Sequence, residues 1–293
     1  RSRTISRRLS EPASSATPCR SAPCARRSSA IGRIARRARS HTGAILCALL
    51  WLAAPVWAAL PDTIDRVRPS IVAVGTMKPA KRANAAGPAL NYLGTGFVVG
   101  NGRQVVTNFH VVPQKLDVDA MEALAVFTGH GGAGEVREAR VLRSDPDHDV
   151  ALLEIGGTVL PALELGPREK VREGEEIAFT GFPIGPVLGL YPATHRGIVA
   201  AITPVVIPAM SSQTLTADQI KRIRSPFEVY QLDAVAYPGN SGSPVYEVDS
   251  GRVVAVINSV LVKKTKEAAL ADPSGITYAI PVRFVRQLLD GHD

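Results

Sequence analysis

In the stretch YPGNSGSPVY, residues Tyr237 to Tyr246, one serine, Ser241, has glycines two positions before it and one after it. Two interpretations of it are open. Gly239 permits a tight turn in which its own N–H and that of Ser241 point at one spot, as a developing oxyanion requires. A turn without chemistry is the alternative, because glycine, proline, asparagine and serine are ordinary turn residues. Ser241 becomes a nucleophile only if a base can take its proton.

A candidate base stands in RQVVTNFHVV (103–112), where His110 ends an apolar run with strand character. We expect neighbouring strands to fix its ring. The alternative is a core histidine satisfied by backbone hydrogen bonds. The other histidines lie in the arginine-rich leader, a glycine-rich loop, a charged cluster, a later strand and the C-terminal end: His41, His130, His148, His195 and His292.

A histidine base needs the right tautomer, and a buried carboxylate on its other ring nitrogen supplies it. The segment DPDHDVALLEI (145–155) offers Asp145, Asp147 and Asp149. Only Asp149 abuts the apolar run, so we expect it to be drawn inward and the other two to occupy a solvated turn. The order His110, Asp149, Ser241 is that of the chymotrypsin template.

The rest of the chain reads as short apolar or alternating runs separated by glycine, proline and charged clusters, a pattern that predicts an all-β barrel or sandwich. Long alternating helices are missing from this pattern, which argues against a doubly wound α/β fold. Helices are expected at 61–67, 216–223 and 282–290. The expected strands lie within 69–76, 94–100, 103–112, 123–129, 136–144, 149–155, 175–182, 195–203, 227–236, 242–248, 251–262 and 275–282.

The net charge of +8 is concentrated at the N-terminus. Residues 1–40 hold eleven arginines and one acid, which leaves 23 basic and 25 acidic residues, or about −2, for residues 41–293. The folded part therefore lacks the basic surface charge of a nucleic-acid-binding protein, and we expect no nucleic-acid partner.

The uncharged run from Thr42 to Leu60 follows this basic region, and Val56-Trp57-Ala58 resembles a signal-peptidase site. We expect residues 1–58 to be an arginine-rich leader and signal peptide, cleaved after Ala58, with no membrane span remaining. An uncleaved membrane anchor is the alternative. All three cysteines, Cys19, Cys24 and Cys47, lie in this leader, so the mature chain would have none. A cysteine-free exported domain is typical of a bacterial periplasmic or secreted protein.

The three motifs together resemble those of the HtrA-type (Deg-type) serine endopeptidases. VVTNFHVV is similar to their TNxHVV, DHDVALLEI to their D[IL]A[LV][IL] segment and PGNSGSP to their PGNSGGP. The likeness continues through RPSIVAVG, GTGFVV, HRGIVAAI, LDAVA and ITYAIPV, and so covers nearly all of residues 60–290.

This resemblance implies a trypsin-like double β-barrel domain at 59–293, with barrels at about 59–165 and 166–282 and a terminal helix at 283–290. It also implies the roles of the site residues. His110 would be the general base and acid, Asp149 its orienting partner and Ser241 the nucleophile, while the N–H groups of Gly239 and Ser241 would form the oxyanion hole.

The sequence departs from the family at the substrate pocket. Ser243 replaces the usual second glycine, a variant that resembles the glutamyl endopeptidases, but the following strand lacks the histidine those enzymes use. Val235 stands six residues before Ser241, where trypsin has its acidic selector. We expect a pocket formed by Val235, Asn258 and Ser259 that accepts small or medium aliphatic side chains.

We therefore expect an exported serine endopeptidase that acts on unfolded or extended polypeptides, in envelope quality control or in processing of a single target. A silent or latent peptide-binding scaffold with a trypsin fold is the rival. No PDZ domain is expected after the protease region, and the long segment 204–226 is interpreted as a lid, a sensor, a decoration or a homo-oligomer contact. No cofactor and no metal site are expected, because the mature chain has no cysteine and its histidines are not spaced as ligands.

Overall fold

The computed structural model describes residues 60–79, 89–129, 134–167, 171–184, 190–204, 226–258 and 276–291. The helix expected at 216–223, the signal-peptidase site and residue Ser259 of the expected pocket lie outside these ranges. The described elements are α2 (Leu60–Val67), η1 (Arg68–Ser70), β1 (Ile71–Lys78), β2 (Ala89–Val99), β3 (Gln104–Thr107), η2 (Phe109–Val111), β4 (Ala123–Thr128), β5 (Glu135–Asp145), β6 (Val150–Ile155), β7 (Glu176–Gly181), β8 (Ala193–Pro204), β9 (Glu228–Asp233), β10 (Pro244–Glu247), β11 (Val253–Asn258), β12 (Ile276–Pro281) and α5 (Val282–Asp290).

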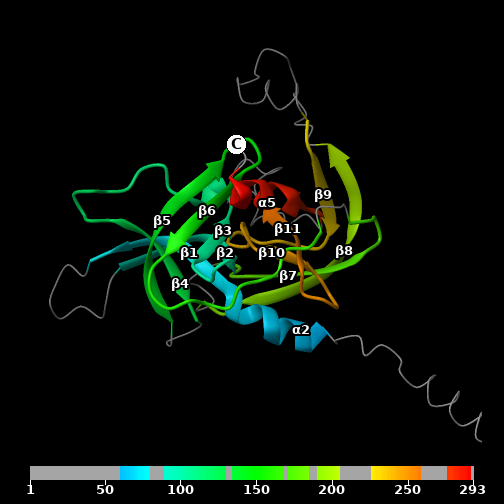
Figure 1. Cartoon of the computed structure of the whole chain (residues 1–293), viewed down its shortest axis with the longest axis horizontal. Coiled ribbons are helices and arrows are strands. Elements are labelled where there is room, and N and C mark those ends of the chain that lie inside the picture. The colour runs from blue at the N-terminus through cyan, green and yellow to red at the C-terminus, as the bar shows by residue number, and fades with distance from the viewer. Residues whose placement is uncertain are drawn as a thin grey trace, which may run out of the picture. The chain divides into compact units, whose positions relative to one another are not determined.

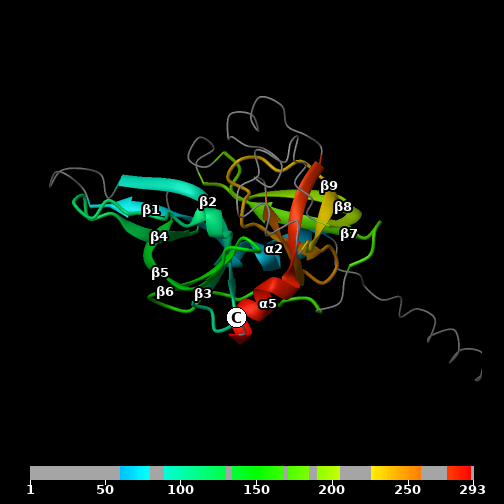
Figure 2. The same ribbon diagram turned by 90° about the horizontal axis from the view of Figure 1, so that it is seen from above.

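The strands form two closed antiparallel barrels, which confirms the expected all-β, trypsin-like fold. The first barrel has the strand order β1-β2-β3-β6-β5-β4 and the second β10-β11-β12-β9-β8-β7. Figures 1 and 2 show the barrels side by side, the first at the left and the second at the right. Each barrel is built from consecutive strands, and β6 ends at Ile155 while β7 begins at Glu176.

Alternating side chains divide the apolar residues into three clusters. In β2, Val98 packs inside the first barrel, whereas Phe97 and Val99 belong to a second set that contains residues of both barrels. This division follows from the strand period of two, which sends successive side chains to opposite faces. A third cluster, which includes Phe179 and Leu232, fills the second barrel.

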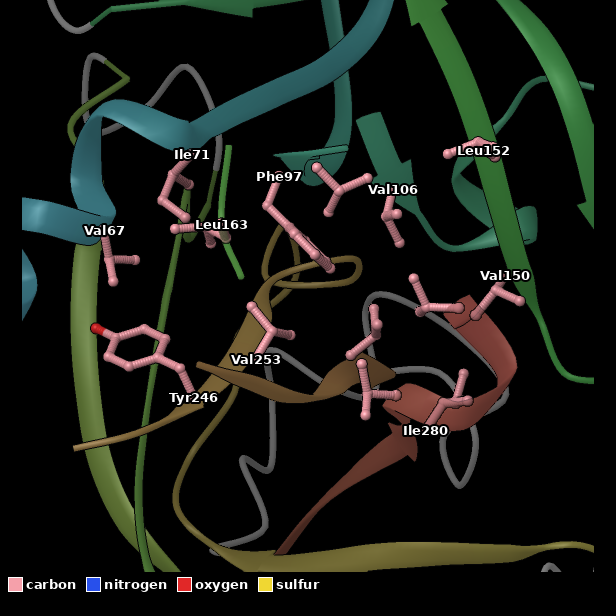
Figure 3. Packing of buried hydrophobic residues seen from close by; sticks show 14 of the residues in the cluster. Val67, Ile71, Phe97, Val106, Val150, Leu152, Leu163, Tyr246, Val253 and Ile280 are labelled. Atoms are coloured by element: carbon pink, nitrogen blue, oxygen red, sulfur yellow. The ribbon is translucent and has the colours of Figure 1, made fainter. Parts of the chain in front are cut away.

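The cluster shared by both barrels forms the seam between them. Phe97 and Ile71 of the first barrel face Tyr246 and Ile280 of the second in Figure 3, and Val67 of α2 joins them. Burying one such large side chain contributes about 1.5–3 kcal/mol. The seam therefore fixes one barrel against the other, and residues at the facing strand ends can form a common site.

Helix α5 is attached to the first barrel by a histidine. The ring of His148 stacks on Phe284 of α5 with 3.8 Å between centroids and meets Phe227 edge-on at 4.7 Å. Asp145 holds this ring: its carboxylate accepts the His148 backbone N–H at 3.1 Å and lies 2.6 Å from the ring Nδ1. Asp145 was expected to lie in a solvated turn, but here it is a half-buried partner of His148. Arg143 adds hydrogen bonds of 2.9 Å to the carbonyls of Leu288 and Leu289 in the last turn of α5.

In the ranges that the structure describes, no helix has both the length and the apolar character that a membrane crossing requires.

We predict that Asp145→Asn lowers the free energy of unfolding at pH 7 by about 1–2 kcal/mol, since it removes a charged acceptor from His148. Burial raises the pKa of Asp145, but the hydrogen bonds from His148 outweigh it, so the pKa lies below its ordinary value of 3.8. A lowered folded-state pKa stabilises the fold above the unfolded value of about 4, and this contribution disappears as the pH falls through the folded pKa.

Urea unfolding at pH 7 and pH 3 measures the effect. The difference between wild type and Asp145→Asn should shrink at pH 3, whereas the exposed control Asp119→Asn should leave the urea midpoint nearly unchanged at pH 7. Equal unfolding midpoints of wild type and Asp145→Asn at pH 7 would contradict the attachment role of this pair.

Candidate active site

The sequence predicted that His110 ends a strand, but the residue lies on a short turn. Strand β3 ends at Thr107, and His110 belongs to the 3-10 turn Phe109–Val111. The strand ends here because the next polar groups pair with Asp149: its carbonyl accepts the Phe109 N–H at 3.2 Å and the Asn108 side-chain amide at 3.0 Å. Backbone pairing therefore fixes the turn that carries His110.

The structure brings His110 and Asp149 together. One oxygen of the Asp149 carboxylate accepts the His110 backbone N–H at 2.8 Å, and the other lies 2.6 Å from Nδ1 of the ring. The Asp149 side chain is 13% exposed and that of His110 31% exposed. A carboxylate at this distance accepts a proton-bearing Nδ1, which leaves Nε2 as the basic nitrogen of a neutral ring.

Asn258, which the sequence assigned to the substrate pocket, holds the carboxylate of Asp149, and its assignment to the pocket stays a prediction. The Nδ2 of Asn258 donates at 2.7 Å to the Asp149 oxygen that lies against the His110 Nδ1, and Asn258 is buried. Asn258 ends β11 in the second barrel, so this hydrogen bond crosses from one barrel to the other. One signal in the sequence pointed this way: an asparagine at the end of a fully apolar strand needs a buried polar partner.

The turn before Ser241 has the geometry of a type II turn. The Asn240 N–H donates to the Tyr237 carbonyl at 3.0 Å, and Gly239 has φ of +99°, as the third residue of such a turn requires. The Pro238 carbonyl accepts the Ile184 N–H at 2.7 Å. Because C=O and N–H point in opposite directions across a trans peptide, the Gly239 N–H is directed away from Ile184.

Ser241 is anchored next to the turn that carries His110. Its carbonyl accepts the Thr95 N–H at 2.8 Å, and the residue is 4% exposed. A Cβ placed on Gly94 would lie 2.9 Å from the Ser241 carbonyl oxygen and 2.7 Å from a methyl group of Val111. The turn at residues 237–241 (the serine turn) and the turn Phe109–Val111 that carries His110 thus both pack on Gly94. Only glycine permits this close packing.

Ser243 has its own structural explanation. A Cβ on Gly181 would overlap the Ser243 hydroxyl oxygen and lie 2.9 Å from the Asn240 side-chain oxygen. Both Ser243 and Asn240 are fully buried. The space for a serine at this position is therefore provided by a glycine at the end of β7.

Val235 lies half-buried between β9 and the serine turn. The hydroxyl of Thr277 donates to the Ala234 carbonyl at 2.6 Å and accepts the Ala236 N–H at 3.0 Å, so the backbone is fixed on both sides of Val235. The assignment of Val235 to the substrate pocket stays a prediction.

A further histidine lies beneath the serine turn. His195 stacks on Phe179 with 4.8 Å between centroids, and the Tyr237 ring lies 6.1 Å from it. Burial lowers the pKa of His195 below its ordinary value of 6.5, which favours the neutral ring. The sequence alone assigned no role to this residue, and the structure shows its ring stacked on Phe179 of β7 and near Tyr237.

No group of three or more histidine, cysteine, aspartate or glutamate side chains gathers as metal ligands within the described ranges.

We predict that Gly242→Ala destabilises the fold through a clash of backbone atoms. Gly242 has φ of +88°, and an added Cβ would overlap the Thr95 carbonyl oxygen and lie 2.6 Å from the Thr107 hydroxyl. Gly174 is a matched control, because it has φ of +86° but open space around the added Cβ. A positive φ alone costs about 1–2 kcal/mol, and we expect Gly242→Ala to cost at least about 2 kcal/mol more than Gly174→Ala in denaturant unfolding. Equal costs would show that the contact with Thr95 is not tight.

Comparison with known proteins gives a consistent set of relatives. The chain is 30% identical over 190 residues to a "Probable periplasmic serine endoprotease DegP-like" of Pseudomonas putida, covering 65% of this chain and 32% of that protein. A protein of the same name from Ectopseudomonas mendocina is 27% identical over 290 residues, covering 86% of this chain and 54% of that protein. The chain thus spans about a third to a half of the length of these relatives.

The fold is also similar to a solved structure, "HtrA-type protease AlgW with decapeptide", with a TM-score of 0.57 and 20% identity, covering 80% of this chain and 67% of that one. The sequence model of the trypsin-like peptidase domain matches residues 94–256, more than half of the chain. His110, Asp149 and Ser241 all lie within this match. The chain therefore belongs to the trypsin-like peptidase domain family.

Proposed function

We propose that the protein is an exported serine endopeptidase that cleaves peptide bonds through an acyl-enzyme intermediate. One observation carries this proposal: the His110–Asp149 pair, with Nδ1 held by the carboxylate, lies on a turn that packs on the same glycine as the turn of Ser241. The likeness to serine endoproteases supports the same class of chemistry.

Each residue then has a role in acylation. The Nε2 atom of His110 accepts the hydroxyl proton of Ser241 as the oxygen attacks the substrate carbonyl, and the negative charge of Asp149 stabilises the imidazolium that forms. The N–H groups of Gly239 and Ser241 bind the oxyanion. His110 next protonates the leaving amine, and in deacylation it activates a water in the same way.

Three hydrogen bonds orient the Asp149 carboxylate for this role. Two come from His110, and Asn258 donates the third from the second barrel. Asp149 itself has φ of +53°, an uncommon conformation for a residue other than glycine. Strained backbone that is held by several partners is frequent at functional sites, which supports a catalytic role here.

Substrate and location are inferred from the relatives. The similar DegP-like proteins are named periplasmic, and the AlgW structure was solved with a decapeptide. We propose that this protein acts in the periplasm, after removal of its leader, on extended or unfolded polypeptides, in envelope quality control or processing. The rival is a trypsin-fold scaffold that binds peptides without turnover.

A fluorophosphonate probe tests the proposal, because it labels only a serine that a base activates. The purified wild-type chain should be labelled at Ser241, and Ser241→Ala should not be labelled. His110→Ala should react about a hundredfold or more slowly, since the general base is lost. Folded wild-type protein that takes up no label, with or without added peptide, would favour the scaffold.

We also predict the preferred residue before the cleaved bond. If Val235 lines the pocket, a peptide library should show kcat/KM about tenfold or more higher for small and medium aliphatic residues than for lysine or arginine. In Val235→Asp this preference should move toward the basic residues. A wild-type preference for basic or acidic residues would show that other side chains select the substrate.

A further inference from the structure

Thr95 of β2 is a fully buried residue whose polar groups are all paired. Its N–H donates to the Ser241 carbonyl at 2.8 Å, and its carbonyl accepts the Thr107 hydroxyl at 2.7 Å. Its own hydroxyl donates to the Gly239 carbonyl at 2.7 Å and accepts the Phe182 N–H at 3.0 Å. Thr95 belongs to the first barrel, where it pairs with Ala73 of β1.

The direction of the Thr95 hydroxyl bond is determined by its partners. A hydroxyl has one proton and two lone pairs. The Phe182 N–H can only donate, so it occupies a lone pair, and the proton is directed to the Gly239 carbonyl. The Thr95 hydroxyl therefore links the residue after β7 to the serine turn in one fixed orientation.

This link fixes the second of the two peptide groups that flank Gly239. The Pro238 carbonyl, in the peptide before Gly239, is held by the Ile184 N–H, and the Gly239 carbonyl, in the peptide after it, is held by Thr95. Glycine at positive φ can change its dihedral angles at small steric cost. Without these two hydrogen bonds, the turn could rotate the Gly239 N–H out of alignment with that of Ser241.

We propose that Thr95 is a positioning residue for the oxyanion hole: by holding the peptide after Gly239, its side-chain hydroxyl keeps the turn from rotating the Gly239 N–H out of alignment with that of Ser241. This inference rests on the proposed function, because it concerns the same site. Thr95 acts through Gly239 and Ser241 and touches neither the scissile bond nor His110 in this role. The effect of losing the hydroxyl should therefore appear in the transition state and not in the binding of substrate.

The test compares Thr95→Val, which keeps the shape without the hydroxyl, with Thr95→Ser, which keeps the hydroxyl. In Thr95→Val we expect kcat on a peptide substrate to fall about 10- to 100-fold, with KM changed by less than about twofold, because a misdirected oxyanion donor is lost only in the transition state. A peptide aldehyde, whose adduct with serine carries the oxyanion, should bind more weakly by a similar factor. Thr95→Ser should stay within about threefold of wild type in both measurements.

A second pair of variants separates positioning from general loss of stability. Thr76 lies on β1, and its buried hydroxyl donates to the Glu122 carboxylate at 2.6 Å. Thr76→Val also removes a buried threonine hydroxyl, but this variant should keep the wild-type kcat and aldehyde affinity. Thr95→Cys retains a similar volume but has a weak donor, so it should show the same losses of kcat and aldehyde affinity as those expected of Thr95→Val. It provides the test if Thr95→Val fails to fold.

The outcomes distinguish the two proposals. If wild type turns over peptide and Thr95→Val equals it in kcat and aldehyde affinity, the role of Thr95 is refuted and the endopeptidase stands. If Thr95→Val raises KM with kcat unchanged, Thr95 serves substrate binding, which also refutes the inference. Unfolding of both Thr95→Val and Thr95→Cys would assign Thr95 to the fold alone. If folded wild type neither takes up the fluorophosphonate nor cleaves peptide, both proposals fail together.

Discussion

The packing of one barrel on the other is the constraint on which the candidate site depends. Neither barrel carries a complete set of groups: the first supplies His110 and Asp149, and the second supplies Ser241 and Asn258. Phe97 and Tyr246 lie in the seam that fixes the two barrels against each other. Because interior packing is dense and tolerates small displacements poorly, an apolar seam can hold polar groups to within a fraction of an ångström.

Hydrogen bonds across the seam then orient individual groups within the arrangement that packing sets. Asn258 reaches Asp149 from the second barrel, and Thr95 reaches Gly239 and Ser241 from the first. Each barrel therefore orients the half of the candidate site that the other one carries. Because of this reciprocal support, local loosening of either barrel should displace groups in both halves of the candidate site.

Much of the fold follows from the sequence, because its signals are local. Each of the twelve expected segments overlaps one strand, although β2 begins at Ala89, before the expected start at 94, since alternation and flanking turn residues act over a few positions. The helices at 61–67 and 282–290 were also predicted from their own residues. His110, Asp149 and Ser241 could be selected because each stands next to a recognisable local pattern.

The interactions that the sequence did not predict depend on a contact far away in the chain. Asn258 is 109 residues from Asp149, so its sequence context suggested a pocket and not an orienting hydrogen bond. Asp145 looked like a solvent-exposed turn residue because Phe284, on which its partner His148 stacks, belongs to the terminal helix. His110 lies outside the predicted strand because the Asp149 carbonyl accepts hydrogen bonds from the Phe109 N–H and the Asn108 side chain. In each case the contact is tertiary, and a short window of sequence does not identify the residue on its other side.

The glycine beneath Ser243 carries a consequence for how this sequence can vary. Since the hydroxyl of Ser243 occupies the volume that any side chain at position 181 would need, the two positions are not free to change independently. A side chain at 181 would require the Ser243 hydroxyl to move, and it would still lie 2.9 Å from the Asn240 side-chain oxygen. The residue at 243 thus limits which residues position 181 can accept, although the two lie on different strands of the second barrel or next to them.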